Sequence, residues 1–274
     1  MTKVQTAQEA AQNDAYKKTL VELIYQLADD DFIIAFRGSE WLGLAPHIEE
    51  DVAYSSINQN TMGHAAMLYQ LLEDLGEGDA DELAHGRKAN ERKNAIILEE
   101  VNGPGTYLVE PKYDWAFTVV RHYFYDLYKK IKLESLKNSS YEPLAQVAIN
   151  INKEEYYHLM HWGTWFKQLS LAGGEATEKM KAAVEKVWAD LEGLITFGPN
   201  ADKMEEFGLI AGEEELRKQY LSKLESILQS VNFSYPGEPG MKRGNGRIGE
   251  HTKDLDQALE TLSEVYVSIP KATW

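Results

Sequence analysis

The feature that most constrains the fold is a set of long segments in which proline and glycine are rare and apolar residues recur every three or four positions. The chain has only 8 prolines among its 274 residues. Leu20, Leu23, Ile24 and Leu27 show the spacing that places apolar side chains on one face of a helix. Because proline disrupts helix interiors, this pattern predicts an all-α protein.

The same pattern divides the chain into elements. Four long helices are expected at about 14–40, 48–75, 113–136 and 141–171, and three more near 176–191, 212–230 and 254–268. The segment 80–112 is mixed and contains the loop sequence Asn-Gly-Pro-Gly at 102–105. We predict one domain over residues 1–274, with a four-helix bundle at about 15–172 and a C-terminal helical extension at about 176–274.

Composition excludes several classes of protein. The net charge of −16 opposes general binding to nucleic acid or to anionic membranes. No apolar run approaches the roughly 18–20 residues that span a bilayer, and the polar N-terminus lacks the core of a secretory signal. The absence of cysteine rules out disulfides and Cys-ligated clusters. We therefore expect a cytoplasmic protein.

Polar residues interrupt the apolar rows of the long helices. In helix 141–171, Glu155 and His158 lie on the same face as the apolar residues, and in helix 48–75 Thr61 and His64 take the equivalent places. Burying such groups without partners costs several kcal/mol, roughly 2–7 for a neutral group. These side chains are therefore expected to meet inside the bundle.

Two further acidic residues lie on buried rows of the other helices, Glu40 in the first and Asp126 in the third. One acidic residue from each of two helices, plus Glu-x-x-His from each of the other two, is the ligand set of ferritin-like di-iron bundles. The second half is complete here, with Asp126, Glu155 and His158. In the first half, Thr61 stands where a bridging glutamate is needed.

This pattern leaves two interpretations open. The residues Glu40, His64, Asp126, Glu155 and His158 either bind iron in a modified di-iron or mono-iron site, or form a hydrogen-bonded polar network that remains from a metal-binding ancestor. A single Glu-x-x-His is a weak signal, whereas two half-sites in chain order are more specific. Threonine supplies no bridging carboxylate, so a degenerate site is expected.

Several separated motifs resemble the C subunits of ring-1,2-phenylacetyl-CoA epoxidases. They are GSEWLGLAP at 38–46, GEGDADELA at 76–84, RHYFYDLY at 121–128, KEEYYH at 153–158 and the ending GRIGEHT…W at 246–274. The resemblance extends over roughly residues 20–274. It implies a ferritin-like fold and a place in the multicomponent monooxygenase of aerobic phenylacetate catabolism, which forms a ring epoxide on phenylacetyl-CoA.

The resemblance also implies partners. In that family a sister A subunit holds the catalytic di-iron centre and pairs with the C subunit, while a small B subunit and a flavin/Fe–S reductase complete the system. The C subunit is regarded as structural. We therefore expect a non-catalytic accessory subunit, able to form a homodimer when alone, in a complex that acts on phenylacetyl-CoA or on another CoA ester. The alternative is an iron-binding oxidase with its own site, and iron storage fits poorly.

A Gly/Pro-rich loop at 234–251 carries the cations Lys242, Arg243 and Arg247. Arginine side chains suit bidentate contacts with phosphate, and glycines let the backbone approach a ligand. The loop is therefore a candidate contact for CoA phosphates or for an acidic partner surface. The simpler interpretation is a solvated loop.

Overall fold

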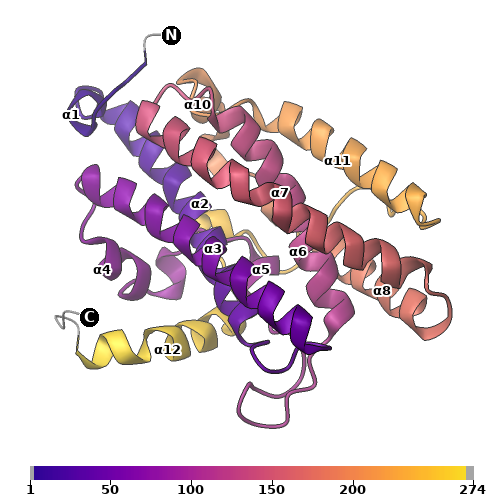
Figure 1. The fold of residues 1–274 in the computed structure, drawn as a ribbon. Helices are drawn as coiled ribbons and strands as arrows, with labels where there is room; N and C mark the ends of the chain where they lie inside the picture. Colours follow the sequence, from indigo (N-terminus) through magenta and orange to yellow (C-terminus); the bar gives the residue numbers. More distant parts are fainter. Residues whose placement is uncertain (1–2, 270–274) are drawn as a thin grey trace.

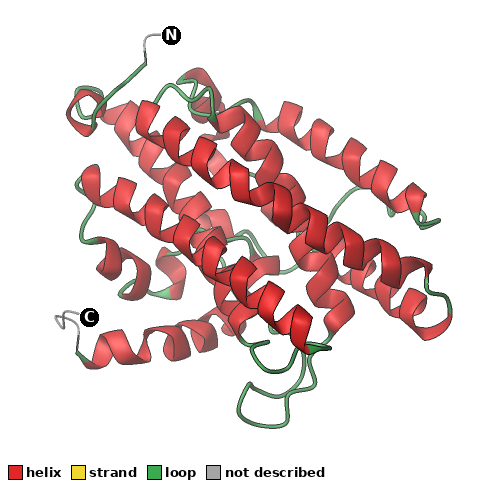
Figure 2. Cartoon of the chain, viewed as in Figure 1, coloured by secondary structure: helices red, strands yellow, loops and turns green. Residues whose placement is uncertain are grey.

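The computed structural model describes residues 3–269. Trp274, the last residue of the C-terminal motif at 246–274, lies outside the described residues. The protein is all-α, as expected, and its described residues contain two isolated β-bridges but no β-strand (Figure 2). The four long helices of the bundle are confirmed. They are α2 (Asp14–Ser39), α3 (Ile48–Asp74), α6 (Trp115–Leu136) and α7 (Glu142–Leu171).

Local sequence signals explain where these helices begin and end. The side chain of Asn13 accepts hydrogen bonds from the backbone of Ala15 and Tyr16 and caps the start of α2. Asp114 caps α6 in the same way. Helix α7 has a proline in its first turn, where the missing N–H is harmless, and is followed by Gly173 at a positive φ of 79°.

The long helices pack as two antiparallel pairs that face each other. Helix α2 lies along α3, α6 lies along α7, and α3 also contacts α7 (Figure 1). Apolar side chains from all four helices form a continuous core, for example Ile24, Leu68, Phe124 and Leu144. This arrangement is that of a ferritin-like bundle, and it directs the polar residues of the apolar rows towards one another.

The remaining helices cover the bundle. Helices α8 (Gly174–Trp188) and α11 (Glu213–Ser230) pack against α6, and α12 (Lys253–Ser268) lies beside α4 (Ala80–His85) (Figure 1). No helix within residues 3–269 is both long enough and apolar enough to cross a membrane. The shorter elements are α1 (Ala7–Ala10), η1 (Ala89–Glu91), α5 (Ile96–Glu99), α9 (Glu192–Ile195), η2 (Gly198–Asn200), α10 (Ala201–Glu206) and η3 (Gly246–Ile248).

Three consecutive aspartates of α2, at 29–31, are buried and anchor three different parts of the chain. The first pairs with Arg87 at the end of the α4 segment, the second with Arg247 of the Gly-rich loop, and the third with Lys129 of α6. Successive helix residues point about 100° apart, so one short stretch of α2 can reach all three neighbours. These ion pairs fix the loop and α6 relative to α2.

Candidate metal centre

The structure brings together three of the residues that the sequence singled out. Asp126 of α6 and Glu155 and His158 of α7 each offer one ligand atom, and these atoms lie within 4.8 Å of one another. All three side chains are buried, with exposed fractions of 3%, 0% and 1%. The spacing of three residues places Glu155 and His158 on one face of α7, where α6 packs against it.

The other half of the expected set is engaged in protein contacts. The Thr61 hydroxyl donates a hydrogen bond to the carbonyl of Ile57 in its own helix, 2.9 Å away. Nε2 of His64 lies 2.8 Å from a carboxylate oxygen of Glu154, and its Nδ1 lies 3.0 Å from the ammonium of Lys129. Both nitrogens of His64 are therefore committed to neighbours, and Thr61 contributes no free ligand.

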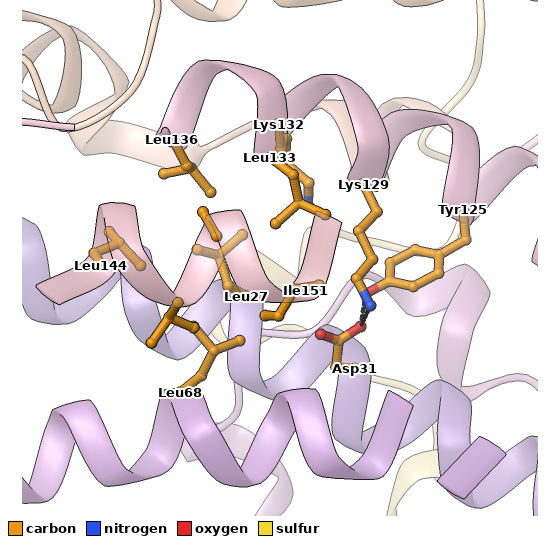
Figure 3. A pocket seen from close by; sticks show the side chains of 12 residues that line it. Leu27, Asp31, Leu68, Tyr125, Lys129, Lys132, Leu133, Leu136, Leu144 and Ile151 are labelled. Carbon is orange, nitrogen blue, oxygen red and sulfur yellow. Dashed lines mark hydrogen bonds and ion pairs between the residues drawn. The ribbon is translucent and has the colours of Figure 1, made fainter. Parts of the chain in front are cut away.

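A buried lysine that was not among the expected site residues lies between the two halves. The ammonium of Lys129 donates to Oδ1 of Asp31 at 2.6 Å, and the hydroxyl of Tyr125 donates to the same oxygen at 2.6 Å (Figure 3). The same ammonium is 3.5 Å from Glu155. Lys129 follows Asp126 by three residues, so its position on the row that carries Asp126 was a signal for its presence in the site.

Glu40 does not lie in this group, although the sequence placed it there. Its carboxylate accepts hydrogen bonds from Arg37 at 2.9 Å and from Asn102 at 2.8 Å. The carboxylate that α2 supplies to the centre of the bundle is Asp31 instead, nine residues earlier and about 13 Å away along the helix axis. Asp31 lies one helical turn after Leu27, on the same apolar row as Ile24 and Leu27. This position in the sequence could have indicated that Asp31 points into the bundle.

Burial sets the protonation of the cluster. Burial, reinforced by the neighbouring Glu155, raises the pKa of Asp126 well above its usual range. Burial also raises the pKa of Glu155 to about 7, and Lys129 offsets only part of this effect. Burial lowers the pKa of both His64 and His158, and the positive charge of Lys129 lowers it further. The pKa of His158 falls to about 3, so both rings are neutral.

Lys129 stays charged in spite of its burial. Burial alone lowers the pKa of its ammonium, but the carboxylates of Asp31 and Glu155 outweigh that effect and raise the pKa above its usual value. The pKa of Asp31 is raised, because burial exceeds the stabilisation that Lys129 provides. The centre therefore holds one permanent positive charge among several carboxylates.

The free ligand atoms are on one side of the cluster only. Oδ2 of Asp126, both carboxylate oxygens of Glu155 and both ring nitrogens of His158 are buried without a hydrogen-bond partner among the described residues. Oδ1 of Asp31, the hydroxyl of Thr61 and both ring nitrogens of His64 already have partners, as described above. The residues present therefore fit one metal ion and do not fit the dinuclear centre of this bundle type.

A small cavity of about 20 Å³ adjoins Asp31 and Lys129 of the cluster (Figure 3). Asp31, Tyr125 and Lys129 line one end, and leucines such as Leu27 and Leu68 line the rest. This volume holds about one water molecule, whereas a cavity that binds benzene measures about 150 Å³. The cavity is too small for the aromatic ring of a substrate.

The cations of the Gly-rich loop have different surroundings. Arg247 is 1% exposed, and its guanidinium donates to both oxygens of Asp30 at 2.8 and 2.9 Å. Arg243 pairs with Asp190 and with Glu100, each at 2.8 Å. Lys242 is exposed. Two of the three side chains predicted to meet a phosphate thus bind carboxylates of the protein itself.

Comparison with known proteins agrees with this architecture. A family model described as "Phenylacetic acid catabolic protein" matches residues 1–274. The chain is 26% identical over 250 residues to the C subunit of 1,2-phenylacetyl-CoA epoxidase from Escherichia coli K12, covering 91% of this chain and 96% of that protein. It is 25% identical over 256 residues to the A subunit of the same enzyme, covering 86% and 76% respectively.

Proposed function

This chain belongs to the phenylacetic acid catabolic protein family, and we propose that it is the accessory subunit of a multicomponent oxygenase that epoxidises phenylacetyl-CoA. Its relatives are a C and an A subunit of one such enzyme. In this proposal the chain pairs with a sister di-iron subunit of the A type and holds it in its active form. A small B subunit and a flavin/Fe–S reductase complete the cytoplasmic assembly.

The observation that carries the accessory role is the loss of half of the dinuclear ligand set. The hydroxyl of Thr61 is bonded to its own helix, and the ammonium of Lys129 lies among Asp31, His64 and Glu155. Oxygen activation in bundles of this type uses a pair of bridged metal ions held by four carboxylates. A chain with a lysine between the half-sites supports the family fold without that chemistry.

An exposed apolar surface supports pairing with another subunit. Ile48 and Val52 of α3 and Tyr156, Tyr157 and Met160 of α7 are between 55% and 75% exposed. Helices α3 and α7 pack against each other, so we call these five residues the α3–α7 face. Aromatic residues and methionine are enriched in protein interfaces, and we propose that the sister subunit covers this face. A homodimer of the isolated chain would use the same surface.

Contact of the loop cations with CoA phosphates remains a proposal that rests on Lys242, because Arg243 and Arg247 are paired internally.

A second candidate function, a redox role of this chain itself, is favoured by the unpartnered atoms of Asp126, Glu155 and His158. Iron held by these three residues would supply one-electron redox chemistry.

The test is reconstitution. Purified sister subunit, small subunit and reductase are assayed for NADPH-dependent conversion of phenylacetyl-CoA with and without this chain. We expect a large loss of turnover without the chain, and no turnover by the chain with the reductase alone. Full turnover by the sister subunit without this chain would overturn the accessory role. Turnover by this chain without the sister subunit would establish the second candidate.

A pair of variants separates docking from folding. Tyr157→Asp, on the α3–α7 face, is expected to weaken co-elution with the sister subunit and to reduce turnover. Lys179→Ala, whose side chain is 65% exposed on α8, is the control and should change neither. Equal co-elution of both variants would show that the partner binds another surface.

A further inference from the structure

The unpartnered polar atoms of the bundle centre have a specific distribution. Five of them belong to only three residues, Asp126, Glu155 and His158, and one ligand atom of each residue lies within 4.8 Å of the other two. Buried polar groups in folded proteins are nearly always paired, because each unpaired one is costly. Two carboxylates and an imidazole are also the donor types that first-row divalent metal ions accept. A ligand for this group is therefore expected to be a cation.

The charges of the cluster determine how many cations fit. A ferritin-like dinuclear centre balances four carboxylates with two divalent ions. Here three carboxylates remain, those of Asp31, Asp126 and Glu155, because Thr61 replaces the fourth. The ammonium of Lys129 adds one positive charge, so the cluster carries two negative charges when all carboxylates are ionised. That is the charge of one divalent ion.

The position of Lys129 explains which ion is replaced. Its ammonium lies 2.6 Å from Asp31 and 3.0 Å from His64, the two groups of the first half that still resemble metal ligands. It also lies 3.5 Å from Glu155, which bridges the two halves in the dinuclear pattern. A metal ion cannot approach Asp31 and His64 while the ammonium occupies the space between them.

We propose that Asp126, Glu155 and His158 bind a single first-row divalent metal ion, and that the Lys129 ammonium permanently takes the place of the second ion of a dinuclear centre. The site is thus a mixed centre of one metal and one ammonium, neutral as a whole. The inference does not depend on the accessory role, because a chain that only supports a partner is free to hold this ion for its own stability.

The experiment measures metal content of the full-length chain alone. The protein is stripped with EDTA, equilibrated with Co(II) and analysed for cobalt per chain, and the visible spectrum of bound Co(II) is recorded. We expect one ion per chain. Glu155→Gln and His158→Gln should each weaken Co(II) binding by more than about 100-fold, since loss of a mere supporting contact already costs about 10–100-fold. His158→Gln should also shift the visible band of any Co(II) that still binds.

A second set of variants tests the role of Lys129. Thr61→Glu alone should leave the content at one ion per chain, because the ammonium still occupies the second position. Thr61→Glu combined with Lys129→Met removes the ammonium and restores the fourth carboxylate, and the content should rise to two. Glu82→Gln is the matched control, because Glu82 and His85 form the same Glu-x-x-His spacing on α4, outside the bundle centre; it should leave one ion bound.

Clear outcomes would overturn the proposal. A wild-type chain that binds no more cobalt than Glu155→Gln would show that the three residues form a metal-free polar cluster. Two ions in the wild type, or one in the double variant, would show that Lys129 does not replace an ion. The visible spectrum of the wild type tests imidazole coordination even if a variant fails to fold. None of these results affects the reconstitution assay, so the two proposals fail independently.

Discussion

Replacing Lys129 by methionine tests the ion pair at the centre of the bundle. The side chain is 4% exposed, and its ammonium is the principal charged partner of the buried Asp31. Methionine has a similar length and fills the space, so the substitution removes the charge with little loss of packing. It leaves Asp31 with the hydroxyl of Tyr125 as its remaining side-chain donor. Breaking one side of a buried pair costs about 3–5 kcal/mol.

The expected loss is measurable in thermal unfolding. For a domain of this size, about 1 kcal/mol shifts Tm by roughly 2–4 °C, so Lys129→Met should lower Tm by about 10 °C in EDTA at pH 8. Lys129 holds down the pKa of Asp31 and Glu155, so its removal raises both further. A carboxyl group whose pKa is higher in the folded than in the unfolded state stabilises the fold fully at a pH below its unfolded pKa. That stabilisation is lost as the pH rises through the folded-state pKa. The penalty of the variant should therefore shrink between pH 8 and pH 5.

Lys132→Met is the matched control one turn along α6. Lys132 is equally buried, but its ammonium is 3.5 Å from Asp30, which already receives two hydrogen bonds from Arg247. Burial outweighs Asp30 and lowers the pKa of Lys132 to about 8, so at pH 7 the wild type bears the cost of a charged buried lysine. We expect this variant to be within about 1 kcal/mol of wild type or more stable. Equal destabilisation by both substitutions would refute the special role of Lys129.

Three further predictions concern other parts of the chain. Burial raises the pKa of Glu155 to about 7 in the folded state, so the wild type loses stability as the pH rises through that value. Glu155→Gln should therefore show a smaller fall in the free energy of unfolding between pH 6 and pH 8, measured by urea unfolding in EDTA. Arg247→Met should lower the free energy of unfolding by about 3–5 kcal/mol in the same assay, because it removes the main partner of the buried Asp30 carboxylate. Lys242→Met, in the same loop, should change it by less than about 0.5 kcal/mol. Tyr157→Asp should leave Tm nearly unchanged while weakening co-elution with the sister subunit, since the side chain is 64% exposed.

The helices were predictable because their determinants are local. Apolar periodicity, capping side chains such as Asn13 and Asp114, and glycine at the end of α7 act within a few residues of each boundary. Each of the seven helices expected from the sequence has a counterpart, with boundaries within a few residues. The short helices α4 and α5 in the mixed segment were not predicted, because four to six residues are too few to show a period.

The site was only partly predictable because it depends on contacts between helices. Glu155 and His158 followed from one face of one helix, and Asp126 from another. Glu40 was expected in the site because the apolar row of α2 was extended to the end of the helix, but there Arg37 and Asn102 bind its carboxylate. The pairing of Lys129 with Asp31 joins residues 98 positions apart, and nothing in either local pattern specifies it.

Lys129 also explains how the bundle keeps its packing with an incomplete ligand set. In a dinuclear centre the metal ions cross-link all four helices of the bundle. Here the single ammonium, carried by α6, contacts Asp31 of α2, His64 of α3 and Glu155 of α7. The three candidate metal ligands, in contrast, join α6 and α7 alone. Because the ammonium is part of the chain, this cross-link forms on folding and needs no iron. A surface such as the α3–α7 face is then held in place for a partner whatever the supply of metal.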